Sequence, residues 1–139
     1  MGHIALLQID HTRFYDTQEG NHIKSRAAST QISNCRIEDG PDGTSSYLVD
    51  IPNGGDLVMS DTILEKGPNA QNHTTAVTIG EEKMMSNPTS RLRVTNNTFT
   101  NKGRETVFVT NHTGTPVELA GNKLLGNAIT PLKELGTAQ

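Results

Sequence analysis

Apolar and polar residues alternate in five similar segments along this chain. The segments read LLQIDHTRFYD, STQISNCRIED, DLVMSDTILEKG, RLRVTNNTFTNKG and VELAGNKLLGN. Each has one apolar residue before a short polar or small stretch and a second apolar residue after it. The first are Ile9, Ile32, Met59, Val94 and Leu119, and the second are Phe14, Ile37, Leu64, Phe99 and Leu124. Such self-similarity indicates a repeat architecture.

The spacing of the segments is nearly regular. The second apolar residues follow one another at intervals of 23, 27, 35 and 25 residues, and the long interval contains EEKMMSNPTS, where we expect a loop to bulge out. A further apolar stretch lies between consecutive segments, at 22–26, 46–51, 75–79 and 106–110. Gly, Asn, Asp and Pro separate the stretches, so we predict two short strands in each repeat.

These repeats predict a solenoid in which each coil stacks on the previous one as parallel strands, roughly 4.8 Å apart. The slot at the bend holds Asn97 and Asn122, with Thr12, Cys35 and Thr62 in the earlier repeats. Asn tolerates left-handed backbone geometry, and amide side chains in this slot can bond to one another up the stack. The alternative is an antiparallel sandwich of short strands, which shows similar alternation but does not require the same slot at a fixed period.

Composition agrees with a thin core in a single domain over residues 1–139. The chain has 32% hydrophobic and 4% aromatic residues and no Trp. The 12 Lys and Arg against 15 Asp and Glu, with no basic cluster, argue against a nucleic-acid surface. There is no apolar run long enough to span a membrane and no membrane-binding stripe. The opening MGHIALLQID lacks the pattern of a signal peptide, and the single Cys35 excludes an internal disulfide.

The repeats resemble those of the right-handed parallel β-helix, or pectin-lyase-like, superfamily. A narrower resemblance is to segments of uncharacterised bacterial β-helix repeat proteins. The stretches that carry it are GNHIKSRAA, DGPDGTSSYLVDIPNGG and LEKGPNAQN with the later GEE. The resemblance covers nearly the whole chain and implies an all-β, right-handed solenoid of about five coils, roughly 25 Å tall. It also implies an extracellular or periplasmic location. Family members usually carry more coils and an amino-terminal cap, so we expect this chain to be the carboxy-terminal portion of a longer β-helix protein.

A short, uncapped solenoid exposes strand edges and core side chains at both ends. The tail TPLKELGTAQ is a weak candidate for a cover over one end. We therefore expect a homo-oligomer, specifically a dimer joined end to end. The alternative is that loops cover the ends.

The resemblance implies a sugar chain bound along one lateral face, as in polysaccharide lyases, epimerases and glycosidases. Proton abstraction beside a uronate carboxylate needs a base and a group that neutralises the carboxylate. The further strands of the first two coils, with the turns after them, supply the catalytic candidates Lys24, Arg26, Tyr47 and Asp50. The substrate-binding candidates are His22, Asn53, Glu81 and Glu82.

Alternation would place His22, Lys24 and Arg26 on one outward face, with Ile23 and Ser25 pointing inward. By the same rule, the adjacent Glu81 and Glu82 would point to opposite faces, so an acid pair for glycoside hydrolysis would need a partner such as Asp50. The competing interpretation is an ordinary ladder of exposed charges, each pair contributing about 0–1 kcal/mol.

We expect neither a metal nor a cofactor. His22 and His73 lie two coils apart, roughly 10 Å, too far to share one zinc ion. Asp39 and Asp42 in EDGPDG lack the ligand run of a calcium loop and are expected to be solvated turn residues. Cys35 is expected to be a buried space-filler. Two functions remain open: a carbohydrate-active enzyme, or a non-catalytic module that binds glycan or protein, or assembles through its open ends.

Overall fold

The computed structural model describes residues 4–82 and 87–136, which form three parallel five-stranded sheets and no helix. Sheet A contains β1 (Leu6–Asp10), β4 (Ser29–Ser33), β7 (Asp56–Ser60), β10 (Leu92–Thr95) and β13 (Val117–Ala120). Sheet B contains β2 (Arg13–Tyr15), β5 (Arg36–Glu38), β8 (Ile63–Lys66), β11 (Thr98–Asn101) and β14 (Lys123–Gly126). Sheet C contains β3 (Ile23–Lys24), β6 (Val49–Ile51), β9 (Thr75–Ile79), β12 (Thr106–Asn111) and β15 (Ile129–Glu134).

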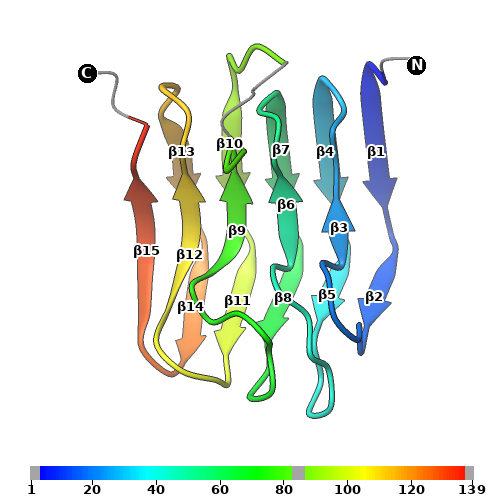
Figure 1. Ribbon diagram of the computed structural model, residues 1–139, viewed down its shortest axis with the longest axis vertical. Coiled ribbons are helices and arrows are strands. Elements are labelled where there is room, and N and C mark those ends of the chain that lie inside the picture. Colours follow the sequence, from blue (N-terminus) through cyan, green and yellow to red (C-terminus); the bar gives the residue numbers. More distant parts are fainter. Residues whose placement is uncertain (1–3, 83–86, 137–139) are drawn as a thin grey trace.

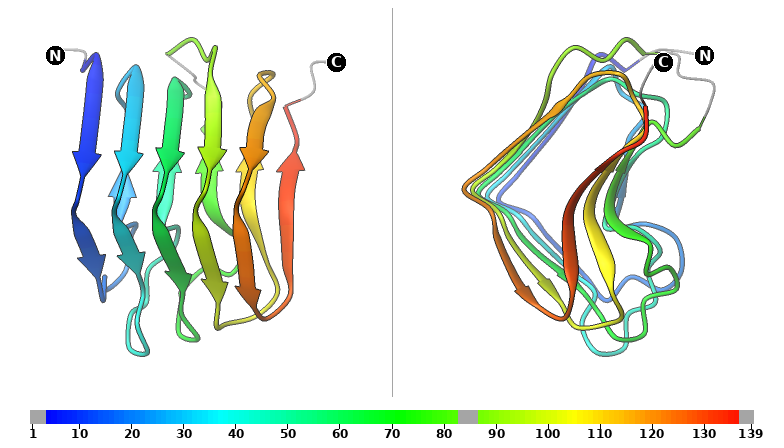
Figure 2. Two further views of the ribbon diagram at one scale, coloured as in Figure 1. Left: turned by 180° about the vertical axis from the view of Figure 1, so that it is seen from behind. Right: turned by 90° about the vertical axis from the view of Figure 1, so that its left-hand side faces the viewer.

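Each coil contributes one strand to every sheet, so the chain is a right-handed parallel β-solenoid of five coils. The coils stack side by side, and the two ends of the chain lie at opposite ends of the stack (Figure 1). A view along the stack shows each coil as a bent, three-sided outline around a narrow interior (Figure 2). The predicted fold class is confirmed, and the antiparallel sandwich is excluded because every strand pairing is parallel.

The apolar positions seen in the sequence form two continuous rows inside the stack. In sheet A, Ile9 pairs with Ile32, and the row continues through Met59, Val94 and Leu119. In sheet B, the row runs through Phe14, Ile37, Leu64, Phe99 and Leu124. Phe99 of sheet B stacks on Phe108 of sheet C with ring centroids 5.2 Å apart. Because the interior is only a few side chains wide, few apolar residues suffice to fill it.

The strand count per repeat was predicted wrongly. Each sequence segment bends at its polar centre, so that it supplies one strand to sheet A and one to sheet B. The residue at the bend has a positive φ in all five coils: 51° at His11, 52° at Asn34, 52° at Asp61, 57° at Asn96 and 69° at Gly121. This left-handed residue turns the chain sharply enough to split one apparent strand into two.

In the last four coils the next residue takes part in the predicted side-chain ladder. Asn122 Oδ1 accepts hydrogen bonds from the backbone N and the Nδ2 of Asn97, both at 3.0 Å. Asn97 Oδ1 in turn accepts from the backbone N of Thr62 at 3.0 Å, and Thr62 Oγ1 accepts from the backbone N of Cys35 at 3.5 Å. The two adjacent asparagines thus have different roles. Asn96 makes the bend, and Asn97 forms hydrogen bonds with the neighbouring coils. Cys35 is 2% exposed, as expected of a space-filler.

A buried polar network fills the corner between sheets B and C. Asp39 accepts hydrogen bonds from His22 Nε2 (2.8 Å), from Ser45 Oγ and from the backbone N of Gly67 (2.8 Å). Burial opposes ionisation of Asp39, but these hydrogen bonds outweigh it, and the pKa lies below the usual value. The expectation of a solvated Asp39 is wrong, because this carboxylate fastens the loops of three consecutive coils.

The inserted residues lie where the long interval predicts them. The connection 80–91 between β9 and β10 is longer than the connections 25–28, 52–55 and 112–116 at the same corner of other coils. It runs back over neighbouring coils: the backbone N of Ser90 donates to Asp56 Oδ1 (2.8 Å), and Asn87 forms a bridge with Gly54. Residues 83–86 of the predicted insertion lie outside the described residues.

The described part of the tail, residues 130–136, does not form a lid. Residues 129–134 form β15, which pairs with β12 and completes the fifth coil. Ile9 and Phe14 of the first coil are only partly buried, and so are the inward residues of the last coil, whereas those of the middle coils are almost fully buried. Within the described residues, the apolar interior is therefore least covered at its two ends.

The ladder makes a prediction about stability. Asn97→Ala leaves the buried N–H of Thr62 without its acceptor, so we expect the free energy of unfolding to fall by about 2 kcal/mol. Asn96→Gly is the matched control, because Gly adopts the same positive φ and should change stability far less. Urea unfolding followed by circular dichroism measures both; equal losses would contradict the role given to the ladder.

A second prediction concerns Lys66, which is fully buried and donates from Nζ to the carbonyl of Ser46 at 2.6 Å. Burial lowers the pKa of Lys66 from 10.5 to about 8. Between these pH values the unfolded chain holds a proton that the folded chain has lost, so stability should rise with pH over this range. This rise in the free energy of unfolding should vanish in Lys66→Met and persist in Lys123→Met, in which the replaced lysine is exposed. If the free energy of unfolding of Lys66→Met rises with pH as it does in the wild type, the prediction is wrong.

Candidate functional site

One outward row of sheet C brings together residues from all five coils. Lys24 pairs with Asp50, Asp50 with Thr78, Thr78 with Thr110, and Thr110 with Lys133. Neighbouring members stand on strands about 4.8 Å apart. The row therefore has cations at both ends and polar oxygens between them. We call these five residues the sheet C row.

A groove of about 210 Å³ lies over the later part of the sheet C row. Three members of the row line it, and so do Tyr47, Glu81 and His112. The groove thus combines an aromatic ring, hydroxyl groups, a carboxylate and a cation. These are the groups that bind polar organic ligands in proteins.

Asp50 is the most perturbed carboxylate of this face. It is 4% exposed; its Oδ2 accepts from Asn21 Nδ2 at 3.1 Å, and its Oδ1 has no hydrogen-bond partner in the described protein. Burial raises the pKa of Asp50 to about 6, against the opposing effect of Lys24 and with a further contribution from Glu81 and Glu82. Asp50 therefore exchanges its proton near neutral pH, as a general acid or base must.

Two further members of the row have unpartnered oxygens. Thr78 and Thr110 are 1% and 5% exposed, and the Oγ1 of each lacks a partner among the described residues. With Asp50 Oδ1, they make three consecutive coils with an unsatisfied oxygen in the same row. Each such group costs about 1–3 kcal/mol when it stays unpaired. Repetition of this cost in one row is unusual for a face that serves only stability.

The cation beside the row is already engaged. Arg26 Nη1 and Nη2 donate to Glu82 Oε1 and Oε2 at 2.9 and 3.1 Å, and Nη1 also donates to Asn53 Oδ1. Both side chains of the ion pair remain about half exposed, at 50% and 46%. An exposed pair of this kind contributes only about 0–1 kcal/mol to stability.

Tyr47 makes a similar contact with the adjacent carboxylate. Its hydroxyl group donates to Glu81 Oε2 at 2.7 Å. Burial, together with this hydrogen bond, raises the pKa of Tyr47 to about 12. Tyr47 therefore keeps its proton at neutral pH, so its hydroxyl group is a hydrogen-bond donor and not a base.

Seven of the eight candidate residues from the sequence gather on this side of the molecule. They are Lys24, Arg26, Tyr47, Asp50, Asn53, Glu81 and Glu82, joined by the register of sheet C and by the contacts above. His22 does not join them. Its imidazole is fully buried between Thr17 Oγ1 and Asp39 Oδ1, each at 2.8 Å. His22 precedes β3, so strand alternation does not govern its direction.

The expectation that Glu81 and Glu82 point to opposite faces is also wrong. They follow β9 and belong to the connection 80–91, where strand alternation has ended. Sequence reasoning missed Thr78, Thr110 and Lys133. The first two occupy the position of Asp50 in the next two coils, so exact strand alignment would have found them; Lys133 was missed because β15 was not expected to be a strand.

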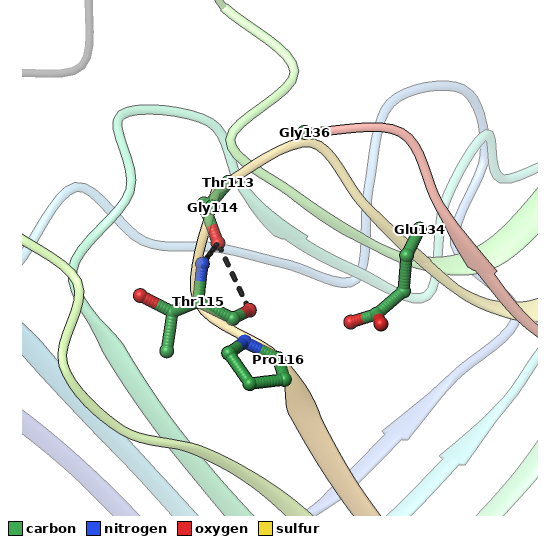
Figure 3. Close-up of a pocket in the computed structure, with 6 residues that line it drawn as sticks. All are labelled: Thr113, Gly114, Thr115, Pro116, Glu134 and Gly136. Carbon is green, nitrogen blue, oxygen red and sulfur yellow. Dashed lines mark hydrogen bonds between the residues drawn. The ribbon is translucent and has the colours of Figure 1, made fainter. Parts of the chain in front are cut away.

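Two other hollows are less suited to a ligand. A cavity of about 370 Å³ on sheet B contains Glu38 and Glu65, but Glu38 is bound to Arg36, and Glu65 to Lys102 and the backbone N of Gly40. A cavity of about 260 Å³ lies at the turn Thr113–Pro116 and faces Glu134. Figure 3 shows the residues that line it. The carboxylate of Glu134 accepts from Asn111 Nδ2 and the backbone N of Val117, so it supports the turn.

The described residues hold no group of three or more His, Cys, Asp or Glu side chains arranged to bind a metal ion. The same part of the chain has no helix that is long and apolar enough to cross a membrane.

The fold and this face define a parallel β-helix repeat protein with a polar lateral groove. No protein-family model matches the chain, and no curated protein or solved structure is significantly similar to it. The likeness to the pectin-lyase-like superfamily therefore rests on the repeat pattern and the solenoid. Membership of a bacterial subgroup stays a prediction.

Proposed function

We propose that the outer face of sheet C binds an anionic polysaccharide. The observation that carries this proposal is the sheet C row, in which three unpartnered oxygens lie in register between Lys24 and Lys133. A sugar chain presents hydroxyl donors at intervals close to the spacing of the coils, about 4.8 Å. A bound chain would place consecutive sugar units over consecutive members of the row, of which Thr78, Thr110 and Lys133 line the groove.

The charges of the face favour an acidic chain. Lys24 and Lys133 stand at the two ends of the row, and neither is in an ion pair within the described residues. Tyr47 adds an aromatic surface of the kind on which sugar rings pack. Carboxylates or sulfates on the chain would meet the lysines, while neutral hydroxyl groups meet the threonines.

If the bound chain is also processed, Asp50 is the residue suited to transfer the proton. Its pKa of about 6 lies near neutrality, whereas Tyr47, at about 12, and Arg26 keep their protons. Lys24, in register with Asp50, would neutralise a uronate carboxylate beside the reacting carbon. The four catalytic candidates would then divide into one proton-transfer group and three binding groups.

The test uses a panel of acidic and neutral polysaccharides, with binding and the ultraviolet absorbance of unsaturated uronate products measured together. Lys24→Ala should weaken binding of the acidic chains by roughly five- to tenfold, about 1 kcal/mol. Lys123→Ala on sheet B is the matched control and should change nothing. Equal binding of acidic and neutral chains, unaffected by Lys24→Ala, would contradict the proposal.

The same assay includes a pH series. Protonation of Asp50 near pH 6 removes a negative charge, so affinity for acidic chains should rise as the pH falls through this value. At neutral pH, the Asp50→Asn variant should bind acidic chains with the affinity that the wild type shows below the pKa of Asp50. Product formation that disappears in Asp50→Asn would extend the proposal to catalysis; binding without product would restrict it to a binding module.

We also propose that the protein self-associates through its carboxy-terminal coil. The inward residues Leu119, Leu124 and Leu132 of this coil are only partly buried. A head-to-tail stack would continue the rows and place Lys123 beside Arg13 and Lys133 beside Lys24, and such like-charge neighbours are unfavourable. Two copies joined through the same end do not require this pairing and form a closed dimer.

Light scattering after size exclusion, from low to high micromolar concentration, tests self-association. The wild type should reach the mass of a dimer, and Leu124→Lys should remain monomeric because it places a charge in the contact. Leu6→Lys, at the opposite end, should still dimerise. A monomeric wild type at every concentration would refute the dimer, whatever the variants do.

A further inference from the structure

Arg26 holds Glu82 in the geometry by which a guanidinium group binds the carboxylate of a ligand. Two parallel hydrogen bonds of 2.9 and 3.1 Å join the two groups. Paired donors matched to both oxygens are the strongest arrangement available to an arginine and a carboxylate. Glu82 thus fills the carboxylate-binding position of Arg26, beside the sheet C row.

Glu81 fills a second position in the same way. Its Oε2 accepts from the Tyr47 hydroxyl group at 2.7 Å, and both residues line the groove. Two consecutive residues of the connection 80–91 therefore present carboxylates to Arg26 and Tyr47, two hydrogen-bond donors of this face.

These carboxylates are not needed to hold their connection in place. The backbone N of Gly80 donates to the carbonyl of Ile51 (2.7 Å), and that of Glu82 donates to the carbonyl of Pro52 (3.1 Å). Further along, Ser90 N and Arg91 N both donate to Asp56 Oδ1. Because these hydrogen bonds hold residues 80–82 and 90–91 without either glutamate side chain, Glu81 and Glu82 can exchange partners while both ends of the connection stay in place.

We propose that Glu81 and Glu82 set the ligand selectivity of the outer face of sheet C by occupying, in the free protein, the positions that ligand carboxylates take. This inference rests on the proposed function. A neutral sugar cannot displace the glutamates, and a single weak acid group competes with them poorly. A uronic-acid chain displaces both, because several of its carboxylates act together. The apparent affinity is then reduced by the fraction of time for which Arg26 and Tyr47 are occupied.

The test compares a linear uronic-acid oligosaccharide with its neutral methyl ester. Glu82→Gln weakens the internal competitor, so affinity for the acid should rise roughly three- to tenfold while affinity for the ester stays within about twofold. Glu81→Gln should also raise the affinity for the acid. The gain should vanish in the double variant Glu82→Gln with Arg26→Ala.

The matched control is Glu118→Gln, which removes the carboxylate of the exposed Arg93–Glu118 ion pair on sheet A (3.2 Å). It should leave both affinities unchanged, and thermal melts should show all single variants folded. If the wild type binds the acid and Glu82→Gln binds it equally or less well, the inference is wrong and the proposed function survives. If neither the wild type nor Glu82→Gln binds the acid, the inference and the proposed function are both wrong.

Discussion

The structure depends on the left-handed residue at the bend of every coil and on the ladder beside it. A positive φ at the same place in five coils divides each segment into a strand of sheet A and a strand of sheet B. In the last four coils the next residue then takes part in hydrogen bonds between neighbouring coils, most fully where Asn97 meets Asn122. A shift of one residue in any coil would break the ladder and turn apolar side chains outward, so the bend fixes the register of all three sheets.

Once the register is fixed, the sequence becomes a set of rows, and this explains what could be predicted from it. The inward rows were identified residue by residue, because a narrow interior demands an apolar side chain at the same position of every coil. The number of strands was not predicted correctly, because a pattern of alternation does not reveal a sharp bend at His11 or Asn96. Outward rows carry no common residue type, and so Asp50, Thr78 and Thr110 share a row without sharing any signal.

The residues whose direction was predicted wrongly lie outside the strands. Alternation holds for Lys24 within β3 but not for His22 before it, which turns into the buried corner and binds Asp39. It fails for Glu81 and Glu82, which follow β9 and both reach the outer face. In each case the direction depends on contacts between coils more than 15 residues apart, which a local pattern does not contain.

Asp39 and Asp50 show how the same side chain can serve structure or chemistry. Both are almost fully buried, but Asp39 receives three hydrogen bonds from loops of successive coils, and its pKa is lowered. Asp50 receives one from Asn21, has an oxygen without a partner among the described residues, and has a raised pKa. Charged residues are common on every outer face of this solenoid and mostly occur in pairs, so charge alone does not distinguish a site. Unsatisfied oxygens at three consecutive positions of one row do distinguish it, because a protein that gains nothing from such an oxygen has two neighbouring coils from which to satisfy it.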